Sequence, residues 1–144
     1  MQLPQELQKF PLATLIVASD SMTAKFYLAG GDAMDEIGAL ILPKEKSSDN
    51  EGSFASSDGS RVAGPVEEDD TERLKHFVKE ISSKISELVG KHGIEQIDLV
   101  MPAEIEHLLT ETLSAEAKPL LKRILQKDLM KESTVELVTR LLAA

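Results

Sequence analysis

The first part of the chain shows the alternation of apolar and polar positions that is typical of strands. Residues 14–19 are nearly all apolar, as in a strand that is covered on both faces. Residues 23–29 alternate with a period of two, which indicates a half-buried strand, and residues 37–42 form a third apolar run. Turn-forming residues at 20–22 and 30–32 connect the three runs, so we predict an antiparallel meander.

Helical periodicity begins after residue 70. Acidic residues at 69–72 suit a helix N-terminus, and the helix that follows is expected to end near Gly90 or Gly93. Its apolar stripe consists of Leu74, Phe77, Val78, Ile81, Ile85, Leu88 and Val89. Residues 97–101 predict a short strand that stops at Pro102. A second helix over 105–113 follows, which 114–118 continue or restart.

The two ends of the chain are harder to interpret. Leu3, Leu7 and Phe10 have helical spacing, so residues 1–11 predict either a short helix over the sheet or a loose arm. Residues 121–125 fit both a helix stripe and an edge strand, and we prefer the strand, in part because of the resemblance described below. Ser133 and Glu136 have the spacing of a capping box at the start of a final helix.

The predicted order is therefore β-β-β-α-β-α-β-α. A right-handed crossover through the long helix places the fourth strand parallel to the first. We predict a single α/β domain over residues 1–144, with one mixed five-stranded sheet in the order 3-2-1-4-5. Strand 2 is antiparallel, and helices cover both faces. This topology is ribonuclease H-like.

Residues 43–70 differ in composition from the rest of the chain. They contain six serines and eight acidic residues against three basic ones, with Phe54 as the only aromatic residue. So little apolar surface does not offset the entropy lost on ordering. We predict a long, flexible, acidic and Ser-rich loop, which is either functional or merely tolerated.

Composition narrows the classes of function. The absence of cysteine excludes disulfides, thiolate metal sites and cysteine nucleophiles. No apolar run approaches the length of a membrane span, and the first residues lack the pattern of a secretory signal, so we expect a cytoplasmic protein without a membrane partner. The net charge of −9 and 3% aromatic residues give no strong nucleic-acid signature.

Two acids are the candidate catalytic residues. Asp20 and Glu104 follow the first and fourth strands, whose carboxyl ends should meet at one edge of the sheet, where open α/β sheets bind ligands. They could hold a divalent metal in a hydrolase or nuclease. Roles as a turn residue and as a helix-start acid explain both without a function, so we predict neither a resident metal nor a cofactor. The three histidines lack ligand spacing and are interpreted as structural.

Three short segments carry a family resemblance. Residues 15–27 read Leu-Ile-Val-Ala-Ser-Asp-Ser-Met-Thr-Ala-Lys-Phe-Tyr, residues 99–102 read Leu-Val-Met-Pro, and residues 127–129 read Lys-Asp-Leu. In this order they resemble the opening hairpin, the fourth strand and the closing strand of the bacterial relatives of archaeo-eukaryotic release factors. These relatives include the group labelled host attachment proteins. The candidate binding residues within these segments are Ser21, Pro102, Lys127 and Asp128.

The resemblance implies the middle-domain fold of a peptide release factor. In release factors the loop after the third strand carries Gly-Gly-Gln, which promotes ester hydrolysis. Here that loop is 43–70, which contains no Gly-Gly-Gln and is acidic, so peptide release is not expected.

The leading hypothesis is therefore a non-catalytic interaction module, with a protein or the ribosome as partner. A metal-dependent hydrolase is the first alternative. A homodimer, paired through an edge strand at 37–42 or 121–125, is the second.

Overall fold

The computed structural model describes residues 1–42 and 70–144. The described elements, in chain order, are η1 (Gln5–Leu7), β1 (Phe10–Ser19), β2 (Thr23–Gly31), β3 (Ala33–Ile41), α1 (Asp70–His92), β4 (Gln96–Val100), α2 (Ala103–Thr112), η4 (Lys118–Leu120), β5 (Leu121–Leu125) and α3 (Thr134–Ala143). The predicted loop over 43–70 lies outside the described residues, apart from its last position. In the two described parts, no helix combines the length and the apolar character that crossing a membrane requires.

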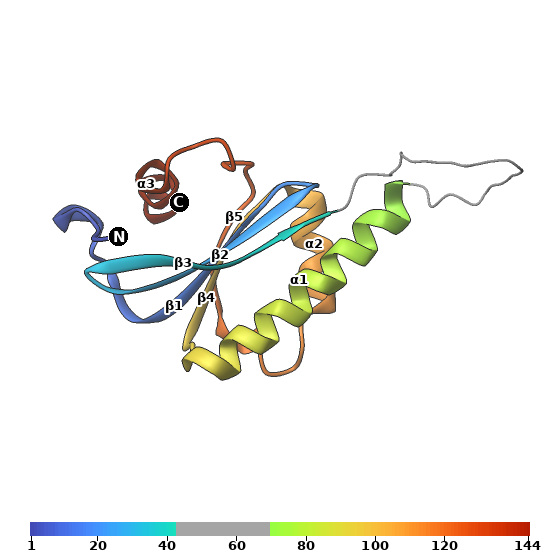
Figure 1. Cartoon of the computed structure of the whole chain (residues 1–144), viewed down its shortest axis with the longest axis horizontal. Helices are drawn as coiled ribbons and strands as arrows, with labels where there is room; N and C mark the ends of the chain where they lie inside the picture. The colour runs from blue at the N-terminus through green and yellow to red at the C-terminus, as the bar shows by residue number, and fades with distance from the viewer. Residues whose placement is uncertain (43–69) are drawn as a thin grey trace, which may run out of the picture.

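The strands form one mixed five-stranded sheet in the order β3-β2-β1-β4-β5, which confirms the predicted fold class (Figure 1). β1 pairs antiparallel with β2 and parallel with β4, and β4 pairs parallel with β5. Ile16 of β1 lies opposite Asp98 of β4. The three parallel strands therefore end at the same edge of the sheet.

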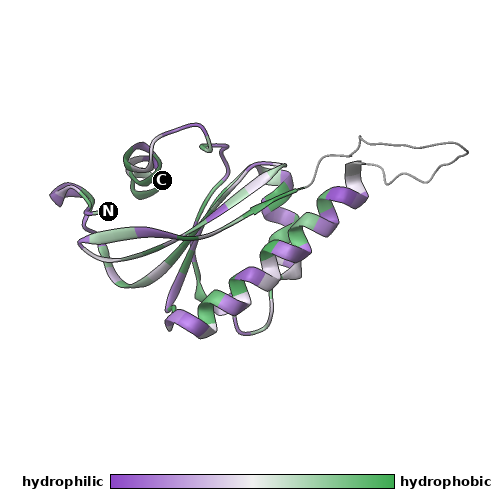
Figure 2. Cartoon of the chain, viewed as in Figure 1, coloured by the Kyte–Doolittle hydropathy of each residue, from purple (hydrophilic) through white to green (hydrophobic). Residues whose placement is uncertain are grey.

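Helices cover both faces of this sheet. In Figure 1, α1 and α2 lie on one face and α3 on the other. Leu15 and Val17 of β1 face the core under α1 and α2, while Ile16 and Ala18 face the core under α3. Because residues 14–19 of β1 are buried on both faces, their sequence is nearly all apolar rather than alternating. Figure 2 shows apolar residues on the inner sides of α1 and α3.

Two strands begin several residues earlier in the structure than the sequence predicts. β1 begins at Phe10, which pairs with Gly31, and a register irregularity separates Phe10 from Thr14. β3 begins at Ala33 rather than at Ile37. Its early residues include exposed acids, and since β3 is an edge strand, charged side chains there face solvent and conceal the strand in the apolar pattern.

The helix ends follow local chemistry. Gly93, with a φ of +61°, comes directly after α1, in the left-handed conformation that glycine adopts without strain. Ser133 Oγ accepts a hydrogen bond of 3.1 Å from the N–H of Glu136 at the start of α3, as the capping box predicts. The Glu136 carboxylate, however, accepts a 2.9 Å bond from Arg140 Nε, one turn further along the helix.

The N-terminal segment packs under the sheet face that α3 covers. It contains one short 3-10 helix, η1, and Leu3, Leu7 and Phe10 are buried together with residues of α3. Gln2 forms an antiparallel bridge with Ala33 at the outer side of β3. This segment thereby completes the second core.

Candidate functional site

All six residues singled out in the sequence lie at the carboxyl ends of the parallel strands. We call this region the carboxyl edge and define it as residues 20–22, 101–104 and 126–128, which follow β1, β4 and β5. It is the place where open α/β sheets bind their ligands. The sequence-predicted residues found there are Asp20, Ser21, Pro102, Glu104, Lys127 and Asp128.

Asp20 organises the turn between β1 and β2. Its Oδ1 accepts hydrogen bonds from the backbone N–H groups of Met22, at 2.8 Å, and Thr23, at 2.7 Å. The buried Ser19 hydroxyl donates to the carbonyl oxygen of Thr23 at 3.0 Å. The turn is thus held by side chains, and it presents Ser21 and Met22 to solvent.

Pro102 and Glu104 lie at the start of α2. Pro102 is the N-cap residue, and its carbonyl oxygen accepts the first helical bond, from the N–H of Glu106 at 3.0 Å. Glu104 is exposed in the first turn, where the helix dipole favours a negative charge. Within residues 1–42 and 70–144, no group of three or more His, Cys, Asp or Glu side chains is arranged to hold a metal ion.

Asp128 and Lys127 lie in the loop that follows β5. Asp128 Oδ1 accepts a 3.1 Å bond from the N–H of Met130, and the N–H of Lys127 donates to the carbonyl oxygen of Leu125 at 2.9 Å. Both side chains are exposed. Asp128 therefore supports its own loop, as Asp20 does, while the Lys127 ammonium is available to a partner.

A buried carboxylate that was not predicted from the sequence, that of Glu106 in α2, links this helix to the loop after β5. The Glu106 side chain is 7% exposed, and it accepts bonds of 2.7 Å from Gln126 Nε2 at Oε1 and from Thr110 Oγ1 at Oε2. The exposed His107 lies 3.6 Å from Oε1 through its Nε2. The Gln126 bond fastens the loop after β5 to α2. The i,i+4 spacing of Glu106 and Thr110 was the available sequence signal.

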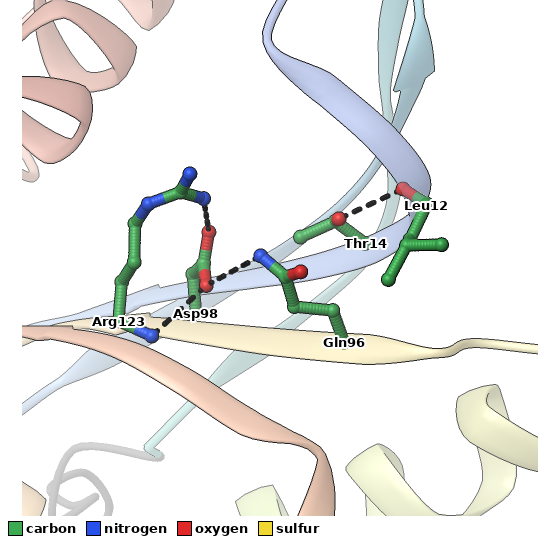
Figure 3. Close-up of polar contacts among 5 residues, drawn as sticks. All are labelled: Leu12, Thr14, Gln96, Asp98 and Arg123. Atoms are coloured by element: carbon green, nitrogen blue, oxygen red, sulfur yellow. Dashed lines mark hydrogen bonds and ion pairs between the residues drawn. The ribbon is translucent and has the colours of Figure 1, made fainter.

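A second polar cluster crosses the sheet away from the carboxyl edge (Figure 3). Asp98, fully buried in β4, accepts a 2.9 Å bond from Arg123 Nη1 at Oδ2. Its Oδ1 accepts bonds from the backbone N–H of Arg123, at 3.2 Å, and from Gln96 Nε2, at 3.4 Å. The guanidinium carbon of Arg123 also lies 5.8 Å from the centre of the Phe10 ring. This cluster ties β5 to β4.

The signal for the Asp98 cluster was a single acid inside the apolar run of residues 97–101. A buried charge needs a partner, and the next strand supplies one in Arg123. In the same region the Thr14 hydroxyl donates to the carbonyl oxygen of Leu12 at 2.9 Å, which satisfies a buried polar group at the register irregularity of β1 (Figure 3). The chemistry of this cluster is therefore structural.

Comparisons with known proteins found one matching family and similar solved structures. A family model described as "Protein required for attachment to host cells" matches residues 15–141. A crystal structure of an archaeal translation termination factor matches with a TM-score of 0.53 and 14% sequence identity, over 89% of this chain and 37% of the termination factor. A structure described only as an archaeal protein matches with a TM-score of 0.48 and 17% identity, over 92% of this chain and 37% of that one. No curated protein matches the sequence.

The likeness to the termination factor confirms the predicted release-factor-like fold. It is a likeness of fold, and this chain spans little more than a third of that protein.

Proposed function

The chain belongs to the family of proteins required for attachment to host cells, and on that premise we propose that it is a non-catalytic interaction module that binds a macromolecular partner at its carboxyl edge. The family description names an attachment role, which is one of binding rather than of bond-breaking. The release-factor-like fold supplies the scaffold.

The observation that carries this proposal is that the carboxylates at and near the carboxyl edge accept hydrogen bonds from the protein itself. Asp20 and Asp128 accept hydrogen bonds from backbone N–H groups of their own loops. The buried Asp98 and Glu106 accept bonds from Arg123 and from Gln126 and Thr110. Carboxylates held in this way fix the shape of loops and strands. The loops of the carboxyl edge are consequently preorganised, which favours binding because less entropy is lost when a partner docks.

The sequence supports the non-catalytic part of the proposal. Gly-Gly-Gln, the tripeptide that the resemblance associates with peptide release, does not occur in the chain. The side chains that the carboxyl edge offers to a partner include Ser21, Met22 and Lys127. This combination of a hydroxyl, an apolar and a cationic group suits the contact of a folded protein or of the ribosome.

Co-sedimentation with ribosomes tests whether the partner is the ribosome. We expect the wild-type chain in ribosomal fractions and expect Met22→Asp/Lys127→Glu to leave them, because the variant replaces an apolar contact and a cation of the carboxyl edge. Val135→Asp/Lys131→Glu is the matched control, since it makes the same changes at exposed positions near α3. Absence of the wild type from every ribosomal fraction would exclude the ribosome as the partner and leave binding to another protein.

Calorimetric titration tests the alternative of a metal-dependent hydrolase. We expect a flat trace with both Mg²⁺ and Mn²⁺, because Asp20 is engaged in its turn and Glu104 faces solvent at a helix start. A stoichiometric binding curve that Asp20→Asn abolishes would contradict the non-catalytic proposal and favour the hydrolase.

A further inference from the structure

The outer edge of β3 is open over its second half. β3 is the end strand of the sheet, and the N-terminal segment pairs only with its beginning: the N–H of Met34 donates to the carbonyl oxygen of Met1 at 2.9 Å. Within the described residues, positions 38–41 pair with β2 on one side, Ile37 lies at the register irregularity, and no strand pairs with positions 37–41 on the other side. We call residues 37–41 the open edge.

The open edge exposes backbone groups that a further strand would satisfy. The N–H of Leu42 donates inward to the carbonyl oxygen of Met22 at 2.7 Å. Hydrogen-bonding direction alternates along a strand, so the N–H and C=O groups of Ile41 and Ala39 point outward. The register irregularity opposite Phe26 and Tyr27 lies at the beginning of the open edge, and the pairing is regular from there to Ile41.

The open edge also lacks the usual protection of an edge strand. Its residues, Ile-Gly-Ala-Leu-Ile, carry no charge, and the Ile41 side chain is 72% exposed. Figure 2 shows the second half of β3 in hydrophobic colours. Natural edge strands are commonly blocked by charged residues or proline. The other edge strand, β5, carries Lys122 and Arg123 at its centre, so β3 is the edge suited to pairing.

A groove of about 320 Å³ lies between the open edge and α1. The residues that line it include Leu40 of β3 and His76, Lys79, Glu80, Lys84 and Glu87 of α1. A Cβ added at Gly38 would lie 3.0 Å from Lys84 Cε, so Lys84 extends across Gly38. α1 runs back along β3 (Figure 1), and one strand residue, about 3.3 Å, corresponds to roughly two helix residues. Ala39 is therefore level with Ser82.

We propose that a second copy of this chain pairs antiparallel with the open edge about a two-fold axis at Ala39. The two Ala39 residues then exchange a pair of backbone hydrogen bonds, and the sheets join into one of ten strands. The pairing also covers Ile41. Self-association of this kind does not depend on the proposed function at the carboxyl edge.

The charges of α1 select a second copy as the occupant. On this alignment the axis lies level with Ser82, with Lys79 and Glu80 on one side of it and Lys84 and Glu87 on the other. Lys84 and Glu87 also form an ion pair with each other, at 3.6 Å. An antiparallel copy brings Lys79 within two residues of the level of the partner's Glu87. It brings Glu80 to the level of the partner's Lys84. The sequence of signs along this flank of α1 is thus complementary to itself.

The test measures the molar mass by sedimentation velocity from dilute to concentrated wild-type protein. We expect the mass to rise from monomer to dimer. Ala39→Pro should stay monomeric at every concentration while its circular dichroism matches the wild type, because the lost N–H points outward and proline is tolerated at such edge positions. A wild type that is monomeric throughout, or an Ala39→Pro variant that dimerises like the wild type, would overturn the proposal.

Charge complementation tests the register independently of any change in folding. Lys79→Glu/Lys84→Glu makes this flank of α1 acidic, and Glu80→Lys/Glu87→Lys makes it basic. We expect each variant alone to raise the dissociation constant roughly tenfold or more, and an equimolar mixture to restore dimerisation. Lys9→Glu/Lys131→Glu, with the same charge change on exposed residues elsewhere, should dimerise like the wild type. Failure of the mixture to associate better than its components would refute this arrangement. Neither result bears on ribosome binding, which the carboxyl-edge variants test.

Discussion

Asp98 lies between the buried Ile97 and Leu99 in β4, between the buried strand β1 and the edge strand β5. Its charge is balanced by Arg123, which is 29% exposed and lies on the adjacent strand. A carboxylate in that position is stable only while its donors remain, since an unpaired buried charge is far more costly than a missing pair. Substitution of Arg123 should therefore lower the free energy of unfolding more than substitution of a residue in an exposed ion pair.

Replacing Arg123 by methionine should show this asymmetry. Arg123→Met keeps an apolar stem beside Phe10 but removes the donor to Asp98 Oδ2, so we expect a loss of about 3 kcal/mol in the free energy of unfolding, measured with urea. The double variant Asp98→Asn/Arg123→Met should recover most of it, because a neutral amide oxygen at position 98 can still accept the backbone N–H of residue 123. Arg140→Met, which breaks an exposed pair on α3, should change stability little. Equal effects at positions 123 and 140 would contradict the structural role of Asp98.

The ionisation of Tyr27, which lies in the core under α3, should make the stability of the protein depend on pH. Burial raises the pKa of its hydroxyl, the charge of Glu36 raises it further, and a hydrogen bond with Thr134 opposes these effects. The unfolded chain therefore ionises first, near pH 10, and the folded state binds the extra proton. Stability that is present below about pH 10 should decline as the pH rises toward and through the pKa of the folded state.

The chain contains one tyrosine, so absorbance titration near the phenolate band reports Tyr27 alone. We expect the folded protein to titrate at higher pH than the urea-unfolded protein. Tyr27→Phe should cost about 1 kcal/mol near neutral pH, through the lost hydrogen bond, and should show a shallower loss of stability above pH 10. Lysines titrate in the same range, so the comparison between wild type and variant isolates Tyr27. Identical titration of folded and unfolded protein would exclude burial of this hydroxyl.

At the scale of elements, two glycines near the end of α1 differ in backbone conformation but not in the space available for a side chain. A Cβ would meet nothing within 4 Å at either Gly90 or Gly93, but only Gly93 has a positive φ. Gly93→Ala should destabilise by about 1 kcal/mol because alanine is strained in the left-handed region. Gly90→Ala, within the helix, should stabilise by roughly 0.5–1 kcal/mol. Thermal unfolding of the two single variants measures both, and effects of the same sign would place the helix end elsewhere.

Elements with strong local signals could be predicted from the sequence. Ser133 caps α3, as its spacing with Glu136 indicates. The range 121–125 is β5, but its own pattern fits a helix equally, and the family resemblance was needed to favour the strand. The beginning of β3 was missed because Asp35 and Glu36 lie on an edge strand, where charge is tolerated. The start of β1 was missed because Phe10 has helical spacing with Leu3 and Leu7, and because Pro11, which has no N–H for a ladder, follows it directly.

The candidate site was predictable in position but not in detail. The order of the strands placed Asp20 and Glu104 at one edge of the sheet, and the structure has both there. The Glu106–Gln126 bond joins residues 20 positions apart, and the Asp98–Arg123 pair joins residues 25 apart. Such pairs form only because particular strands and helices become neighbours in the fold. The periodicity of apolar residues along the chain therefore does not predict which polar residues will pair.

For the whole molecule, the sheet is a single layer shared by two cores. Leu15 and Val17 support one core, and Ile16 and Ala18, the residues that alternate with them in β1, support the other. Damage to either core must therefore weaken the same strand. This arrangement predicts that the two faces unfold together rather than as separate units.

Ile85→Ala and Val138→Ala test that coupling. Both side chains are fully buried, one on the inner side of α1 and one on the inner side of α3. We expect losses of about 3 and about 2 kcal/mol respectively in the free energy of unfolding. Far-UV circular dichroism follows the helices of both faces, while the fluorescence of Tyr27 reports the α3 face. Because β1 belongs to both cores, the two signals should share one urea midpoint in the wild type and shift together in each variant. An Ile85→Ala protein whose dichroism decreases before Tyr27 responds would mean that the α3 face is held by its own contacts and not by the shared strand.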